Sequence, residues 1–159
     1  MFCKQVLYIE NSYFNLFDLV ETLSCSLSPQ ASGTVSEMSL CLVCGVTVCL
    51  TGYCCRRIDE SSGFTISGAQ IHARQCHEGY ALFLNTRNSK VVVLFYQARW
   101  QIYLDPIYLD KFGESDVDLK RGNPLFLNQE AYAKLERNWL NHSIGCVIND
   151  GFLSNDFFV

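Results

Sequence analysis

The chain lacks the features of a membrane-spanning or nucleic-acid-binding protein. Its longest purely apolar run, VVVLFY at residues 91–96, is far shorter than the roughly 18 residues that cross a bilayer. Its 12 Lys and Arg residues are outnumbered by 16 Asp and Glu residues, and no basic run exceeds two residues. Binding to phosphate backbones requires clustered Lys and Arg. We therefore expect neither a membrane nor a nucleic acid among its partners.

A secretory leader is another feature that the sequence does not show. The N-terminal residues MFCKQVLYIENSYF have no signal-peptide pattern. This predicts a protein of the cytoplasm, with the nucleus as a second compartment. Structural disulfides are rare in that reducing compartment, and the odd number of nine cysteines argues against a closed disulfide framework. With 159 residues, 49% of them hydrophobic, the chain is long enough for one core of ordinary size.

Several catalytic and metal-binding patterns are also missing. A zinc deaminase would need His-x-Glu followed by Pro-Cys-x-x-Cys, and a RING finger would need further Cys-x2-Cys pairs near its end. No Asp-x-Asp-x-Asp-Gly loop for calcium is present. A thioredoxin-like Cys pair would follow a parallel strand and begin a helix, whereas here a Ser-rich linker precedes it. We expect no catalytic residue, and a thiol or metal enzyme remains the weaker alternative.

What the chain does have is a cluster of cysteines, CLVCGVTVCLTGYCC, at residues 41–55. Cys41 and Cys44 form a Cys-x2-Cys pair, and His72 and Cys76 form a His-x3-Cys pair further along. Tetrahedral zinc takes four such ligands, commonly from two local pairs. Gly45, directly after the first pair, permits the backbone to turn around a metal. These four residues predict a closed, structural zinc site.

The same region offers further ligands. An isolated buried cysteine is equally well explained as a small apolar side chain on a strand. Adjacent cysteines rarely face one metal together, so a second zinc ion is an open alternative and not the main expectation. The possible additional ligands are Cys49, Cys54, Cys55 and His77.

Apolar periodicity predicts an α+β fold with a short antiparallel sheet and a C-terminal amphipathic helix. Together with the Cys and His pairs, it describes a small zinc-stabilised domain. YALFLNT and KVVVLFYQ read as a β-hairpin, and RWQIYL reads as a third strand. NQEAYAKLERNWLNHS reads as a helix with Asn128 as its N-cap. The expected organisation is a lead-in segment with a short helix over 1–23, a Ser-rich linker over 24–39, a zinc-binding domain over 40–145 and an apolar tail over 146–159.

Charged residues gather between 105 and 121, where the chain is expected to be irregular. The carboxylates there are typical of a solvated surface, and Lys120 and Arg121 follow them directly. This segment continues into RGNPL, a rigid turn before the helix cap.

Taken in order, CLVCG, CC, the His-x3-Cys pair with GYALFL behind it, and YLDKFGESDVDLKRGNPLFLNQEAYAKLERNW resemble the C-terminal region of UBR-type E3 ubiquitin ligases. These ligases are the N-recognins of the N-degron pathway. The most specific part runs from Tyr108 to Leu125, and the resemblance extends from about Phe14 to Ile144. It departs from the family in having no extra Cys just before His72 and in having His77 where the family usually has Gly.

The resemblance implies a place in a much larger protein. Family members carry a substrate-binding UBR box and a RING-type module that recruits the E2, and this chain shows neither. It implies a non-catalytic, autoinhibitory domain that binds zinc and packs on the rest of the parent ligase, with E2 enzymes as partners through that parent. A stand-alone zinc-binding interaction module is the alternative. The residues expected to form an interdomain contact are Asp110, Glu114, Asp116 and Arg121.

Overall fold

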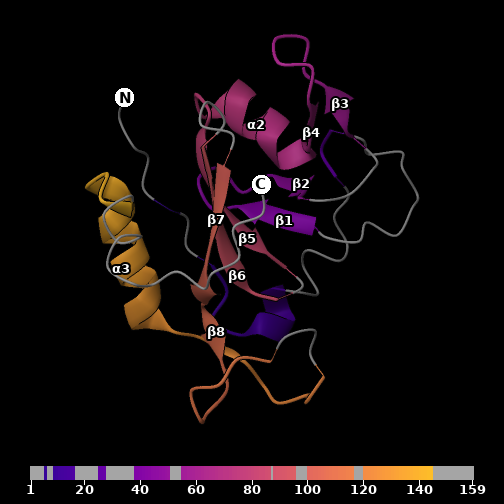
Figure 1. Ribbon diagram of the computed structural model, residues 1–159. Coiled ribbons are helices and arrows are strands. Elements are labelled where there is room, and N and C mark those ends of the chain that lie inside the picture. The colour runs from indigo at the N-terminus through magenta and orange to yellow at the C-terminus, as the bar shows by residue number, and fades with distance from the viewer. Residues whose placement is uncertain are drawn as a thin grey trace.

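The computed structural model describes residues 6, 9–16, 25–27, 38–50, 55–86, 88–95, 100–116 and 120–144. Their centre is a five-stranded sheet with the order β2-β1-β5-β6-β7, in which every neighbouring pair is antiparallel (Figure 1). The strands are β1 (Met38–Cys41), β2 (Thr47–Cys49), β5 (Tyr80–Asn85), β6 (Lys90–Phe95) and β7 (Trp100–Pro106). The predicted α+β class is confirmed.

Strands β5 and β6 form the predicted hairpin, and their residues are almost continuously buried. Continuous burial accounts for their sequences, because a strand covered on both faces carries apolar residues without alternation. Ser89, in the turn, adopts a φ of 56°, and the Lys90 N–H donates to the side-chain oxygen of Asn88 at 3.0 Å. The third predicted strand is present as β7, which pairs with β6.

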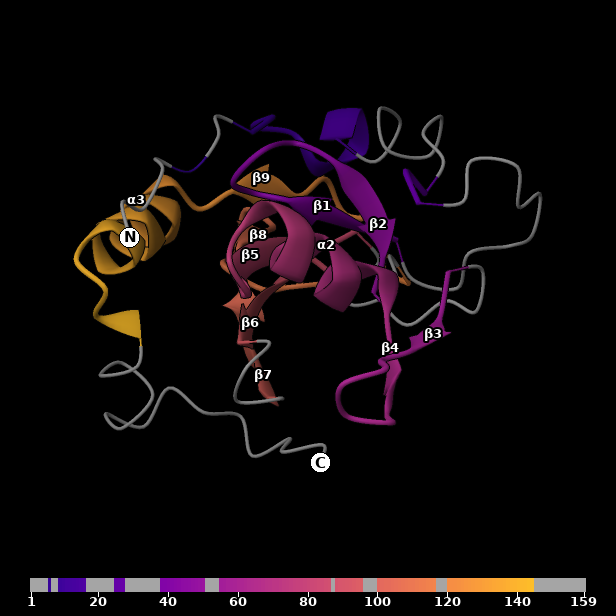
Figure 2. The ribbon, with the colours of Figure 1, turned by 90° about the horizontal axis from the view of Figure 1, so that it is seen from above.

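Helix α2 (Gly68–Cys76) was not foreseen from the sequence. It begins with a capping box: the Gln70 N–H donates to the Ser67 hydroxyl, and the Ser67 N–H donates to the Gln70 side-chain oxygen at 2.8 Å. This Ser-x-x-Gln pattern is a recognised helix-start signal that the sequence does contain. The helix packs on β2 and β5 at one end of the molecule (Figures 1 and 2). The segment before it holds a short hairpin of β3 (Arg57–Ile58) and β4 (Thr65–Ile66).

Helix α3 (Gln129–Leu140) is the predicted amphipathic helix, and Asn128 caps it by accepting from the Ala131 N–H at 3.2 Å. Tyr132, Leu135 and Trp139 are its buried residues. Trp139 stacks on Tyr80 with ring centroids 4.3 Å apart, so this helix is attached to the start of β5.

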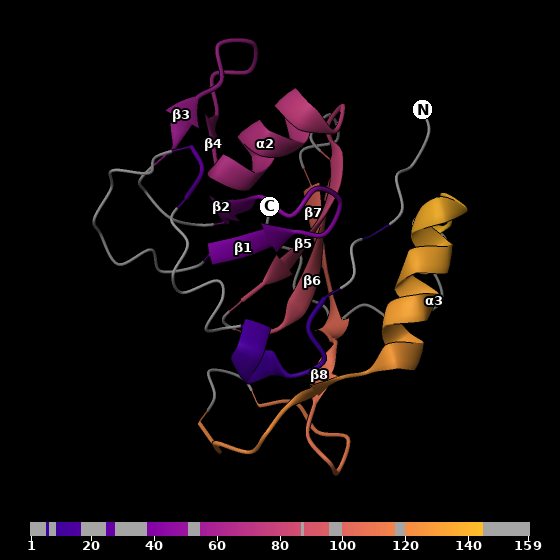
Figure 3. The ribbon, with the colours of Figure 1, turned by 180° about the vertical axis from the view of Figure 1, so that it is seen from behind.

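The N-terminal residues join the opposite end of the molecule from α2, where β8 (Tyr108–Leu109) pairs with β9 (Phe126–Leu127) (Figure 3). Ser12 forms an isolated bridge with Phe126, and the Tyr13 N–H donates to the Leu125 carbonyl at 3.0 Å. Tyr13 and Leu16 lie in the same core as the sheet. Residues 13–16 form one helical turn, while 17–23 and the tail over 146–159 fall outside the described residues.

Among the described helices, neither the length nor the apolar character needed to cross a membrane is found.

Candidate metal centre

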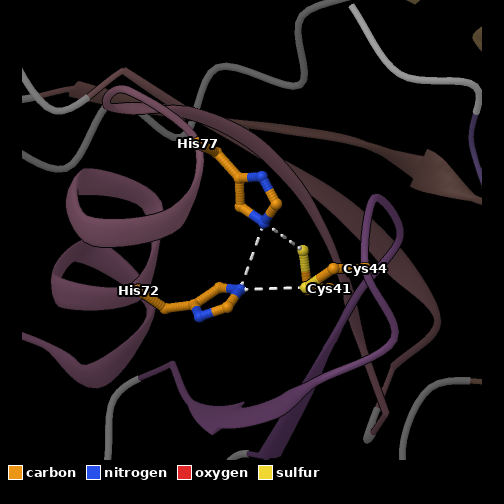
Figure 4. A group of neighbouring side chains, drawn as sticks. All are labelled: Cys41, Cys44, His72 and His77. Carbon is orange, nitrogen blue, oxygen red and sulfur yellow. Dashed lines mark hydrogen bonds between the residues drawn. The ribbon is translucent and has the colours of Figure 1, made fainter.

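Four side chains converge beside α2: Cys41, Cys44, His72 and His77 (Figure 4). Their donor atoms all lie within 4.8 Å of one another. The Cys44 Sγ is 3.2 Å from the His72 Nε2, and the Cys41 Sγ is 3.4 Å from the His77 Nε2. The two Nε2 atoms are themselves 3.2 Å apart. Two sulfurs and two imidazole nitrogens therefore face a common point.

The cysteine pair is positioned by the tight turn between β1 and β2. Cys41 ends β1, and its N–H donates to the Val46 carbonyl at 2.9 Å while its carbonyl accepts from the Gly45 N–H at 2.8 Å. Gly45 has a φ of 81°, a conformation that glycine adopts without the steric cost of a side chain. This turn directs both thiols of the Cys-x2-Cys pair to the same side.

The two histidines are positioned by the body and the end of α2. His72 projects from the helix, and His77 is its C-cap residue, with φ −135° and ψ 25°. The chain then turns through Glu78 and Gly79, both with positive φ, and the Gly79 N–H donates to the Ala73 carbonyl at 2.8 Å. Because His77 leaves the helical path, its ring returns toward Cys41 and the ring of His72.

The donor spacing fits zinc. With Zn–N near 2.0 Å and Zn–S near 2.3 Å, a tetrahedral ion holds two nitrogens about 3.3 Å apart and a nitrogen and sulfur about 3.5 Å apart. The three observed separations are 3.2, 3.2 and 3.4 Å. Cys₂His₂ is an established ligand set for structural zinc. The residues present therefore suit this metal in both chemistry and spacing.

Burial sets the protonation states of two of the four side chains. Burial lowers the pKa of His72, which keeps its imidazole neutral and its ring nitrogen available as a ligand. Burial raises the pKa of Cys41 to about 12, so without a cation its thiol keeps its proton. A bound zinc ion displaces such a proton, which makes metal binding dependent on pH.

The structure places the residues of the predicted zinc site in different environments. Cys41, Cys44 and His72 come together, whereas Cys76 is exposed and does not belong to the group. His77, which the sequence marks only as an additional ligand, lies in the fourth position. Cys76 sits one turn after His72 on α2, at a spacing where two side chains share a helix face. The sequence spacing alone makes it the natural fourth ligand.

The other possible ligands separate as well. Cys49 and Cys55 lie in a second group with Cys25, and Cys54 falls outside the described residues. Cys25 was not singled out from the sequence. It stands 16 positions before Cys41 without a partner at metal-ligand spacing, so no local pattern marks it.

The acidic segment is braced by its own carboxylates. Asp110 accepts from the N–H groups of Phe112 and Glu114 at 2.8 and 2.9 Å, and these bonds, with that to Glu114 foremost, lower its pKa. Asp116 accepts from the Arg121 N–H at 3.0 Å. Glu114 and Arg121 form an exposed ion pair. Asp110 and Asp116 therefore hold the loop together, and Glu114 and Arg121 present its charge to solvent.

Comparison with known proteins shows the family of the chain. A model of the Proteolysis_6 C-terminal family matches residues 11–141. The chain belongs to the Proteolysis_6 C-terminal family. Human E3 ubiquitin-protein ligase UBR1 is 40% identical over 145 residues, which cover 86% of this chain and 8% of that protein. Mouse E3 ubiquitin-protein ligase UBR2 is 35% identical over 142 residues, covering 89% of this chain and 8% of the ligase.

The likeness extends to invertebrates, since E3 ubiquitin-protein ligase ubr-1 of Caenorhabditis elegans is 35% identical over 136 residues, 86% of this chain and 6% of that protein. The chain thus spans less than a tenth of the length of these relatives. As a Proteolysis_6 C-terminal domain, it corresponds to the C-terminal domain of UBR-family ligases, and its resemblance to that family is confirmed.

Proposed function

We propose that this chain acts as the zinc-binding regulatory and interaction domain of a UBR-type E3 ubiquitin ligase in the N-degron pathway. The group of Cys41, Cys44, His72 and His77 carries the proposal, because it supplies four protein ligands. A zinc site with four protein ligands is structural, whereas a catalytic site keeps one position for water or substrate. This closed site therefore supports a non-catalytic role for the domain.

In this role the zinc links two parts of the fold. Cys41 and Cys44 belong to the turn after β1, and His72 and His77 belong to α2 and its end. The metal supplies binding free energy that is realised only when the turn and helix are packed together, so it contributes directly to folding. Its function in the parent ligase is to keep this end of the domain in one shape.

The exposed pair Glu114 and Arg121 supports a contact with the rest of the ligase. Both side chains are half or more exposed, at 59% and 50%, while Asp110 and Asp116 hold the loop beneath them. A charged pair on a braced loop offers both signs of charge in a fixed position, which suits a specific polar contact. The proposed partners are the RING and UBR-box regions of the parent, and E2 enzymes through it.

The first test is the metal content of the purified chain. Elemental analysis should find bound zinc, and Cys41→Ser should lower both the zinc content and the melting temperature of the chain. A zinc-free preparation that folds, or a Cys41→Ser variant with a normal melting curve, would count against the structural metal.

The second test addresses the regulatory role. The chain mixed with ubiquitin, E1 and a panel of E2 enzymes should assemble no ubiquitin chains. A UBR-type ligase lacking its own C-terminal domain should ubiquitinate an N-degron substrate faster, and adding this chain in trans should slow it again. Glu114→Arg combined with Arg121→Glu serves as the surface variant and should weaken that inhibition. Robust chain formation by the isolated chain would refute the non-catalytic role.

A further inference from the structure

A second group of sulfur atoms lies apart from the first. Cys25, Cys49 and Cys55 are 2%, 0% and 5% exposed, and their Sγ atoms all lie within 4.8 Å of one another. The Sγ atoms of Cys25 and Cys55 are 3.7 Å apart. Three thiols from positions spread over 31 residues of the chain thus meet in the core.

Each thiol reaches this point on a separate segment. Cys25 belongs to a turn attached to β2, because the backbone N–H and the hydroxyl of Ser26 both donate to the Thr47 carbonyl at 2.9 Å. Cys49 is the last residue of β2 and pairs with Met38 of β1. Cys55 lies in the turn that leads into β3. The convergence is therefore produced by tertiary structure.

The N-terminus of α2 closes over the group. A Cβ added to Gly68, the first residue of the helix, would stand 2.5 Å from the Cys55 Sγ and 3.1 Å from the Cys49 carbonyl oxygen. Only glycine lets the backbone approach this closely. The first N–H groups of a helix have no partner within it and carry the positive end of its dipole. Negative charge on the sulfurs is thus favoured at this place.

Two simpler explanations account for less of the geometry. A disulfide requires about 2.05 Å between sulfurs, and the 3.7 Å separation leaves Cys25 and Cys55 as thiols. Buried thiols that only fill space would need neither a glycine nor a helix N-terminus against them. By contrast, two thiolates on a tetrahedral zinc ion lie about 3.8 Å apart.

We propose that Cys25, Cys49 and Cys55 form a second metal site, all of sulfur, for a thiophilic d¹⁰ ion such as Zn²⁺. Soft thiolate ligands select this class of ion over calcium or magnesium. Three thiolates and a divalent ion carry a net charge of −1, which the N-terminus of α2 offsets. The helix then has a metal at each end: this site near Gly68, and the Cys₂His₂ site at His72 and His77.

This assignment differs from a second zinc drawn from the sequence alone. Of the four possible additional ligands, His77 lies in the first group, and Cys25 takes its place beside Cys49 and Cys55. The proposal goes beyond the regulatory function and does not depend on it.

The test is the metal stoichiometry of the 159-residue chain, stripped of metal under a thiol-free reductant and reconstituted with Zn²⁺. The wild-type chain should hold two zinc ions by elemental analysis. Cys55→Ser should hold one, and its matched control Cys44→Ser, a Cys→Ser change in the first group, should also hold one. Cobalt in place of zinc should separate the two sites, because thiolate-to-cobalt charge-transfer absorbance grows with the number of sulfur ligands. Cys55→Ser should lose the more sulfur-rich spectrum and Cys44→Ser the other.

The outcomes separate this site from the first. One zinc in both wild type and Cys55→Ser, with none in Cys44→Ser, would overturn the second site and leave the proposed function standing. Two zinc ions in Cys44→Ser would refute the first site instead. If Cys55→Ser does not fold, the cobalt titration of the wild-type chain decides, since saturation at one equivalent overturns the proposal. A Cys25–Cys55 disulfide found by peptide mapping of the natively isolated chain would overturn it as well.

Discussion

The fourth ligand of the Cys₂His₂ site gives the sharpest prediction. The structure places the His77 Nε2 at 3.2 Å from the His72 Nε2 and 3.4 Å from the Cys41 Sγ, and it leaves Cys76 exposed. Replacing His77 by Ala should therefore weaken zinc binding at this site, whereas replacing Cys76 by Ala should not. His77→Cys, which restores a soft ligand, should recover much of the affinity.

The size of the effect follows from the metal's contribution to folding. Structural zinc in small domains binds with roughly 10–16 kcal/mol, so one ligand of four accounts for about 3 kcal/mol, or roughly a hundredfold in affinity. For a domain of this size, each kcal/mol moves the melting temperature by about 2–4 °C. His77→Ala should thus lower the melting temperature of the zinc-loaded chain by roughly 6–12 °C.

The assay is competition with a chromophoric chelator, run beside thermal melts at a fixed excess of zinc. Both single variants share the same helix end, so a general disturbance of that end would affect both. A large loss of affinity in Cys76→Ala together with an unchanged His77→Ala would show that the His-x3-Cys pair binds the metal and that the placement of His77 is wrong.

Three further substitutions test individual contacts within the fold. Gly68→Ala should cost about 1–3 kcal/mol of unfolding free energy through the clash with Cys55, although alanine favours helices. In denaturant melts the same change should cost less in a Cys55→Ala background than in the wild type, and equal costs in the two backgrounds would refute the clash. The lowered pKa of Asp110 means that its carboxylate contributes stability above its unfolded pKa near 4, and that this contribution disappears as pH falls through the folded value. Wild type should therefore be more stable than Asp110→Asn at pH 7 and should converge with it in acid; a constant difference down to pH 2 would exclude the carboxylate as the cause. Trp139→Ala should cost about 3–5 kcal/mol because the ring is buried against Tyr80, whereas exposed Leu140→Ala should cost under about 1 kcal/mol, and equal losses would contradict this placement of α3.

In the acidic segment, the residue spacing is enough to recognise the family, but it does not reveal what the carboxylates bind. The spacing from Tyr108 to Leu125 identifies the family because it encodes a particular loop: Asp110 and Asp116 accept backbone N–H groups two to six residues further on. Sequence inspection treats these carboxylates as a solvated surface, since a side chain bonded to a nearby backbone amide looks the same in sequence as a solvated one.

Local patterns were enough to predict a large part of this domain. The β5–β6 hairpin, strand β7 and helix α3 follow from apolar periodicity and capping, which act over a few residues. The turn at Gly45 follows in the same way, since its backbone conformation depends on the residue itself. Pair spacing within the sequence likewise groups Cys41, Cys44 and His72, which the structure brings together.

Only the tertiary structure decided which further side chains join them. Cys76 has the better helical spacing to His72, yet α2 ends there, and the turn through Glu78 and Gly79 brings the ring of His77 back toward Cys41. Cys25 meets Cys49 and Cys55 because its turn is attached to β2 and because Gly68 lets α2 approach. A metal site depends on distances between donor atoms, and such distances depend on how separate segments pack. Sequence spacing determines them only within one continuous element.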